Sequence, residues 1–253
     1  MSWIITGEQV NPAGDAQITY GITSTGGVFN LRSTGTVDYE VEWGDGTVER
    51  STSNALAHTY AAGSYVLKIR TAQQYVPYFN NSTDEDQITS VALVSDLDVG
   101  TSLLRAWYGA NNITSFDAAF GVTAGVDDFT STWRTCSSLT SFPLIDTSSG
   151  TSFSNTWRTC TSLTDFPANF FDSWTGTPAT NCFAATWLGC SSLTATSVEN
   201  ILNSIDTSLR SAPASGVDIT IDYNAASGTP NISTAVSNLK SRNWTITLNG
   251  VLQ

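Results

Sequence analysis

Apolar residues in the middle of the chain recur with a long period. The stretch 129–143 carries Phe, Trp, Cys, Leu and Phe-Pro at spacings that return in 153–167. A third copy begins at Phe183, and an earlier copy with alanine in place of the cysteine begins at Leu103. Such self-similarity is typical of stacked units that cannot bury their apolar faces alone. The pattern therefore predicts a repeat array.

Each repeat divides into two predicted elements. Phe129, Trp133 and Cys136 lie at i, i+4 and i+7, which places them on one face of a short helix. The Ser-Leu-Thr segment that follows predicts a short strand, which stops at a proline in two copies. Residues 88–248 are therefore expected to form one curved parallel sheet with helices on its other side. The residues that mark the expected strands are Ile88, Ile113, Leu139, Leu163 and Leu193.

The two ends of the chain follow other patterns. Short alternating segments rich in β-branched and aromatic residues predict a sandwich of about seven strands near the N-terminus. The clearest of these segments are 17–22, 28–32, 37–43 and 65–70. Near the C-terminus, an amphipathic helix, a strand, a second helix and a last strand are expected to cap the array. Those elements are 197–209, 217–222, 233–242 and 244–248.

The resulting domain organisation has four parts. An N-terminal arm is followed by the sandwich, the repeat array and the cap. The expected bounds are 1–14, 15–80, 81–196 and 197–253.

Three motifs of the N-terminal part carry a family resemblance. Trp43-Gly-Asp-Gly is followed by His58-Thr-Tyr and then by Gly63-Ser-Tyr. In this order they resemble the polycystic-kidney-disease (PKD) domain family over roughly residues 15–72. The resemblance implies an immunoglobulin-like module without catalytic activity.

The repeats are similar to the leucine-rich repeats of bacterial surface antigens, the BspA-like group, over about residues 88–196. They depart from that pattern by a tryptophan within each expected helix and by an insertion before Phe183. Arrays of that group occur in bacterial surface adhesins and in phage virion proteins, often behind a PKD-like module. The two resemblances together imply a mixed fold: an all-β immunoglobulin-like sandwich, an α/β leucine-rich-repeat solenoid with parallel strands, and a C-terminal βα cap.

Composition and charge restrict the function classes. The 253 residues are 40% hydrophobic, which suits a globular chain with a sizeable core. The net charge of -12 repels phosphate, so nucleic acid is not expected as a partner. The sequence contains neither an apolar run long enough to cross a bilayer nor a signal-peptide pattern. We therefore expect a soluble protein that is made in the host cytoplasm and does not insert into membranes.

Three of the four cysteines occupy one repeated position. Cys136, Cys160 and Cys190 are expected to stack as buried thiols, because a thiol behaves as a small hydrophobe and a cytosolic origin disfavours disulfides. Cys182 lies outside this pattern.

The sequence offers little catalytic chemistry. The single histidine, His58, lies in an expected strand without a nucleophile motif, which favours a structural hydrogen bond over acid–base work. Asp84, Glu85 and Asp86 form the densest acidic cluster, which could hold calcium or hydrolyse a glycoside but is more typical of a solvated linker. Asp45 is a second calcium candidate and is more typical of a turn. No catalytic residue, metal site or cofactor is predicted.

Two sets of residues are candidates for a binding surface. Phe170, Phe171 and Trp174 lie in the insertion, where they form either an exposed sugar-stacking or docking patch or, as we favour, part of the core. Arg134 and Arg158 recur at one outward position, for which a solvated face is the favoured interpretation.

A third set is a candidate anchor. Trp3, Ile4 and Ile5 are apolar and lie outside the sandwich motif, so they could attach the chain to a particle.

The function expected from these features is that of a non-enzymatic phage virion surface protein. It would be an adhesin, a fibre or a capsid-decoration protein on the virion surface, with other virion proteins and host surface polysaccharide as partners. The alternatives are a polysaccharide-degrading virion enzyme and a bacterial cell-surface adhesin. The sequence leaves open the position on capsid or tail, the ligand and the oligomeric state.

Overall fold

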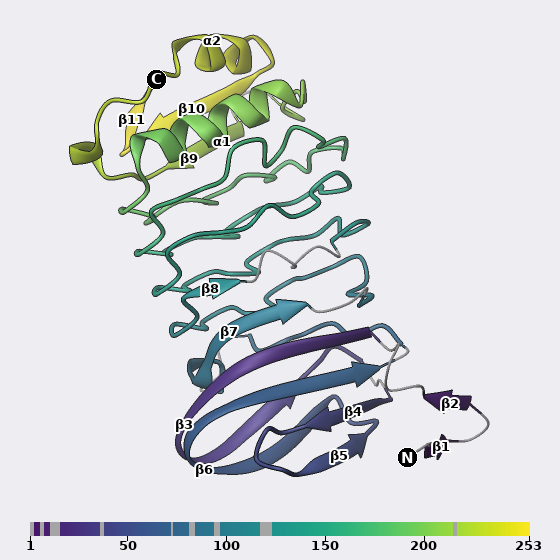
Figure 1. The fold of residues 1–253 in the computed structure, drawn as a ribbon. Coiled ribbons are helices and arrows are strands. Elements are labelled where there is room, and N and C mark those ends of the chain that lie inside the picture. Colours follow the sequence, from purple (N-terminus) through teal and green to yellow (C-terminus); the bar gives the residue numbers. More distant parts are fainter. Residues whose placement is uncertain are drawn as a thin grey trace.

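The protein is elongated, with a curved sheet at one end, stacked coils in the middle and two helices at the other end (Figure 1). The computed structural model describes residues 3–5, 8–10, 16–35, 38–71, 73–80, 84–93, 97–116, 123–214 and 217–253.

The N-terminal sheet has six strands in the order β5-β4-β6-β3-β7-β8. The strands β1 and β2 form a separate antiparallel hairpin. The bounds are β1 Trp3–Ile5, β2 Glu8–Val10, β3 Ala16–Arg32, β4 Tyr39–Glu42, β5 Val48–Ser51, β6 Ala55–Thr71, β7 Ile88–Leu93 and β8 Ser115–Phe116.

The expected sandwich is instead one strongly bent sheet. The predicted strands 17–22 and 28–32 are parts of β3, which pairs with β6 from end to end. Gly26 and Gly27, which lie between these two predicted strands, have φ of 97° and 136°. Glycine adopts these angles without a steric penalty, so the strand bends and its pairing continues on both sides.

The middle of the chain consists of stacked coils rather than helix–strand units. Phe129–Cys136 form overlapping turns, with left-handed φ of 57° at Ser131 and 62° at Thr135. Alternate backbone N–H groups donate to the next coil, as from Phe129 to the Ser152 carbonyl at 2.9 Å. A helix would use these donors internally. The helix prediction for the repeats is therefore wrong.

The predicted fold class is wrong as well. Within the described residues the α-helices are α1, Ala195–Thr207, and α2, Ser233–Ser241, and both follow the repeats. In the part of the repeats that the structure describes, parallel pairing between coils comprises β7 with β8 and isolated bridges such as Asp128 with Ser152. The protein is mainly strands and turns, and neither a sandwich nor an α/β leucine-rich-repeat solenoid is present in the described chain.

The coils nevertheless enclose columns of stacked aromatic rings. Trp107, Trp133, Trp157 and Trp187 are fully buried, and successive ring centroids lie 5.9, 5.6 and 5.9 Å apart with interplanar angles of 9–12°. Trp133 and Trp157 are thus buried, stacked neighbours in this column. Burial of such large rings is a major source of stability for each coil.

Buried hydroxyl groups tie each coil to the preceding one. Thr132 lies before Trp133 and donates through Oγ1 to the Leu103 carbonyl at 2.9 Å or the Phe129 carbonyl at 2.7 Å. Thr156 donates in the same way to the Phe129 carbonyl at 2.9 Å. These bonds satisfy buried polar atoms and favour one axial register of the stack.

The repeated cysteines make a similar connection. The Cys160 thiol donates to the Trp133 carbonyl at 3.1 Å, and the Cys190 thiol donates to the Trp157 carbonyl at 3.0 Å. Burial raises the pKa of Cys190 to about 12, so its thiol keeps the proton that it donates. All four cysteines are buried and free.

The elements predicted near the C-terminus are confirmed, with small shifts. They are α1, β9 Val217–Ile221, α2 and β10 Trp244–Leu248; β11, Val251–Leu252, and the 3₁₀ turns η1, Glu85–Gln87, and η2, Ala225–Ser227, complete the set. Strands β9 and β10 are parallel, and α2 connects them. The helix α1 begins two residues early because Thr194 caps it by accepting from the Ser197 N–H.

Candidate functional site

One face of the coil stack carries a regular array of uncharged polar side chains. In each coil a buried Ile or Leu is flanked by one polar residue on each side, and alternation along an extended segment directs both flanking residues outward. We call these residues the polar ladder: Gln87, Thr89, Asn112, Thr114, Ser138, Thr140, Ser162, Thr164, Ser192 and Thr194.

The threonines of the polar ladder are in strand-like register. Each backbone N–H donates to the carbonyl of the equivalent threonine one coil earlier, at 3.2, 3.4, 2.9 and 3.1 Å along the stack from Thr114 to Thr194. Backbones joined in this way lie about 4.8 Å apart. The ladder therefore repeats a threonine hydroxyl at nearly constant steps.

Two of these hydroxyls are oriented by the backbone. Thr140 donates through Oγ1 to the Thr114 carbonyl at 3.4 Å, and Thr164 is placed to donate to the Thr140 carbonyl at 3.0 Å or to Asp165 Oδ2 at 2.9 Å. A hydroxyl has one proton and two acceptor lone pairs. Once the proton is donated inward, a ligand finds mainly acceptors on this face.

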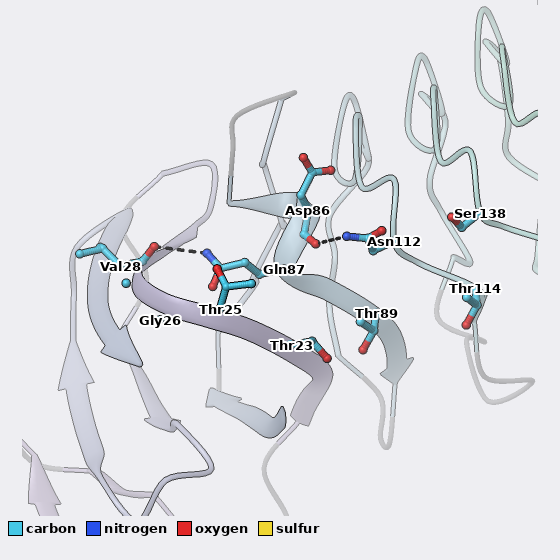
Figure 2. A pocket seen from close by; sticks show the side chains of 11 residues that line it. Thr23, Thr25, Gly26, Val28, Asp86, Gln87, Thr89, Asn112, Thr114 and Ser138 are labelled. Atoms are coloured by element: carbon cyan, nitrogen blue, oxygen red, sulfur yellow. Dashed lines mark hydrogen bonds between the residues drawn. The ribbon is translucent and has the colours of Figure 1, made fainter. Parts of the chain in front are cut away.

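A groove of about 680 Å³ lies at the N-terminal end of the polar ladder (Figure 2). Figure 2 shows Thr23 on β3, Thr89 on β7 and Thr114 on the next coil in succession. The full lining is Thr23, Thr25, Gly26, Gly27, Val28, Asp86, Gln87, Thr89, Asn112, Thr114 and Ser138. The groove is thus built jointly by the bent sheet and the first coils.

Hydrogen bonds hold the two amide side chains of the groove. Gln87 Nε2 donates to the Val28 carbonyl at 3.2 Å, and Asn112 Nδ2 donates to the Asp86 carbonyl (Figure 2). The neighbouring Asn111 Nδ2 donates to Asp86 Oδ1 at 3.0 Å. Each of these bonds uses one of the two protons of an amide nitrogen, and the amide oxygens of Gln87 and Asn112 are the groups that could accept from a ligand.

The acidic cluster beside the groove is mostly structural. Asp84 and Glu85 are buried, and Asp84 accepts from the backbone and side-chain nitrogens of Asn30 at 3.0 Å each and pairs with Arg32 at 3.5 Å. The expectation of a solvated linker is wrong, because this aspartate joins η1 to β3. Among the described residues that line the groove, Asp86 is the single carboxylate, whereas acid-pair glycoside hydrolysis uses two.

Comparison with protein-family models, curated proteins and solved structures gave no match. The resemblances to PKD domains and to leucine-rich repeats therefore stay predictions at the level of sequence motifs.

The Trp43-Gly-Asp-Gly segment forms a hydrogen-bonded turn. Asp45 Oδ1 accepts from the Thr47 hydroxyl at 2.6 Å and the Thr47 N–H at 3.0 Å, and Oδ2 lies 2.8 Å from His58 Nε2. The Thr47 bonds, followed by His58, lower the pKa of Asp45 to about 2. His58 also stacks on Trp43 at 4.4 Å, so both residues serve the turn.

The aromatic residues of the insertion are part of the core. Phe170, Phe171 and Trp174 are at most 1% exposed. Trp174 donates through Nε1 to the Gly150 carbonyl at 2.6 Å and packs on Phe153 at 5.8 Å. They are therefore removed from the candidate binding surface, because the packing alternative is the one observed.

Arg134 and Arg158 lie on the side of the stack formed by the turn segments and are partly exposed. The Arg134 guanidinium lies over the Tyr108 ring at 5.1 Å, and Arg158 Nη1 donates to Asn155 Oδ1 at 3.2 Å. The structure places this pair in neighbouring coils and away from the groove lining.

The candidate anchor lies in β1. Trp3, Ile4 and Ile5 pair through their backbones with β2, and their side chains fall outside the described part of the structure.

Metal and membrane sites were sought in the described ranges only. They contain no group of three or more His, Cys, Asp or Glu side chains placed to hold a metal ion. Nor do they contain a helix of the length and apolarity needed to span a membrane.

The sequence interpretation missed the polar ladder. Its signal was present, since a polar residue, Ile or Leu, and Thr recur together in the repeats. Only the central Ile or Leu was interpreted, as the marker of a buried strand, and the outward polar residues on each side of it were not considered.

Proposed function

We propose that this protein is a non-catalytic binding protein whose polar ladder and groove recognise a hydroxyl-rich polymer, namely a surface polysaccharide of a host cell. The observation that supports the proposal most directly is the alignment of threonine hydroxyls, one coil apart, along the stack. Repeat proteins commonly bind along such extended faces.

Rigidity of the stack supports this proposal. The ladder residues flank buried side chains that belong to the same core as the tryptophan column, and the threonine backbones are bonded from coil to coil. A surface whose polar groups are already ordered loses little conformational entropy when it binds. Weak individual hydrogen bonds can then add up to useful affinity.

A binding role also fits the chemistry of the groove better than hydrolysis does. The lining offers one carboxylate together with hydroxyls and amides. The single histidine is engaged by Asp45 in the turn that follows β4. These groups suit recognition of sugar hydroxyls, which act as both donors and acceptors.

The proposed location is the surface of a phage particle, with neighbouring virion proteins as partners. This part of the proposal rests on the motif resemblances alone. Mass spectrometry of purified particles, followed by immunogold labelling, tests it. Absence of the chain from intact particles would point to the alternative of a bacterial cell-surface adhesin.

Binding is tested with purified protein on a panel of host surface polysaccharides. The double variant Thr114→Val/Thr140→Val removes two central hydroxyls with little change of shape, so we expect at least tenfold weaker binding. Thr59→Val/Thr229→Val is the matched control, because both threonines are exposed and lie outside the polar ladder. Equal binding by both variants, or release of oligosaccharides during incubation, would overturn the proposal.

A further inference from the structure

We infer that the ligand of the polar ladder is an extended β-1,4-linked polysaccharide that lies along the stack, with one sugar residue for each coil. The inference rests on the proposed function and adds the linkage, the direction and the length of the bound segment.

The first argument is the axial repeat. The threonine backbones are joined coil to coil by hydrogen bonds of 2.9–3.4 Å, which fixes the step at about 4.8 Å. One sugar residue of an extended β-1,4-linked chain advances by nearly the same distance. An α-1,4-linked chain is helical instead, so its successive sugars do not match a straight array of equally spaced side chains.

The second argument is the width of the polar ladder. In each coil the two outward residues are separated by one buried residue, as Ser138 and Thr140 are by Leu139. Two residues along an extended segment span about 7 Å. A flat sugar ribbon can therefore be contacted along both edges, by the Gln, Asn and Ser column on one side and the threonine column on the other.

The third argument is the chemistry of the contacts. The ten ladder residues include no aromatic ring, so the face offers no platform on which sugars could stack. Thr140 donates its hydroxyl proton to a backbone carbonyl, which leaves its lone pairs for a ligand. The ladder is thus suited to accept hydrogen bonds from the equatorial hydroxyls at the edges of a flat sugar chain.

The fourth argument is that both ends of the ladder are defined. At one end Thr194 Oγ1 accepts from the Ser197 N–H at 3.2 Å as the cap of α1, so it is already engaged. At the other end the groove is lined in part by Gly26 and Gly27, which carry no side chain. The bound segment therefore runs from Thr23 in the groove to Thr164; Thr23 and the four ladder threonines before Thr194 make five positions, which is about five sugars at one per step.

Calorimetry with oligosaccharides of defined length tests the inference. The probes are β-1,4-linked cello- and chito-oligosaccharides of two to six sugars, with α-1,4-linked malto-oligosaccharides of the same lengths as the comparison. We expect affinity to rise with each added β-linked sugar, to level off near five, and to be at least tenfold higher than for the matched α-linked hexamer. The Thr114→Val/Thr140→Val variant should lose this length dependence, while Thr59→Val/Thr229→Val should keep it.

The outcomes separate the inference from the proposed function. If a polysaccharide binds through the ladder threonines but neither β-linked series does, the inference fails and the proposed function stands. A malto-oligosaccharide that binds as tightly as its β-linked counterpart, or affinity that is independent of length, would also overturn the inference. If no glycan binds at all, both fail. Circular dichroism melting of each variant confirms that a loss of binding does not come from unfolding.

Discussion

Trp157 illustrates how single residues stabilise the stack. Its ring lies 5.6 Å from Trp133 and 5.9 Å from Trp187, and the edge-on rings of Phe166 and Phe170 lie 5.0 and 5.5 Å away. Every side of the indole is therefore packed, and its removal would leave a cavity shared by three coils.

Replacing Trp157 is expected to destabilise the protein strongly. Trp157→Ala should lower the free energy of unfolding by about 3–5 kcal/mol, the range for truncation of a large buried aromatic residue. Arg158→Ala changes a partly exposed neighbour and should cost no more than about 0.5 kcal/mol. Urea denaturation of both variants measures the difference, and similar losses would contradict the assigned packing.

Removing one buried hydroxyl should also be costly. Thr156→Val removes the hydroxyl that donates to the Phe129 carbonyl at 2.9 Å, while the Thr132 N–H still donates to that carbonyl at 3.2 Å, so we expect a loss of about 0.5–1.5 kcal/mol. Thr161→Val is the matched control at an exposed position. A control variant that is as unstable as Thr156→Val would show that the buried bond contributes nothing specific.

The turn at Asp45 should contribute a distinct acid dependence. Its pKa is lowered to about 2 from an ordinary value of 3.8, so the unfolded chain takes up a proton at higher pH than the folded chain. The contribution of this carboxylate is therefore present above pH 4 and is lost as the pH falls toward 2. Thermal melting of the wild type and of Asp45→Asn should differ most above pH 4 and converge near pH 2. A constant difference across this range would count against the assignment.

Within each coil, residues in the left-handed backbone conformation distinguish the overlapping turns from the expected helix. Thr135 has φ of 62°, whereas Thr130 has no positive φ. A β-branched residue in the left-handed region costs roughly 1–2 kcal/mol, which glycine avoids. In a helix, by contrast, glycine would be unfavourable at both positions.

Two glycine variants test this distinction. Thr135→Gly should be more stable than Thr130→Gly by about 1–2 kcal/mol, because only the first substitution relieves a left-handed conformation. Chemical denaturation under identical conditions gives the comparison. Equal destabilisation by the two glycines would favour the helix that the sequence pattern predicted.

At the scale of the whole molecule, the N-terminal hairpin is separable from the rest. Strands β1 and β2 form their own two-stranded sheet, apart from the six-stranded sheet. Deletion of residues 1–9 should therefore leave the circular dichroism spectrum and the melting temperature nearly unchanged. If Trp3, Ile4 and Ile5 form the anchor, the same deletion should abolish incorporation into particles. Full incorporation of the truncated chain would eliminate the anchor hypothesis.

The bent sheet and the coils also share one core. The strand β3 lies between β6 and β7, and β7 pairs with β8 of the first coil, so the sheet crosses the boundary expected between residues 80 and 81. Phe79 extends this contact by donating its N–H to the Ala106 carbonyl at 3.2 Å. The groove of the candidate site depends on this continuity.

The sequence pattern was sufficient to predict the repeat period, the inward Trp and Leu positions and the elements near the C-terminus. Those features follow from burial, because each buried position requires an apolar side chain and the spacing of apolar residues in the sequence therefore shows which positions face inward. It could not determine the backbone between the inward positions, because spacing of i, i+4 and i+7 brings side chains to one side in a helix and in these overlapping turns alike. The stacked coils distinguish the two conformations, since the Phe129 N–H donates to the Ser152 carbonyl in the next coil. The same stacking aligns the threonines of the polar ladder. Their separation along the sequence does not give their distance in space, which depends on the register of the coils.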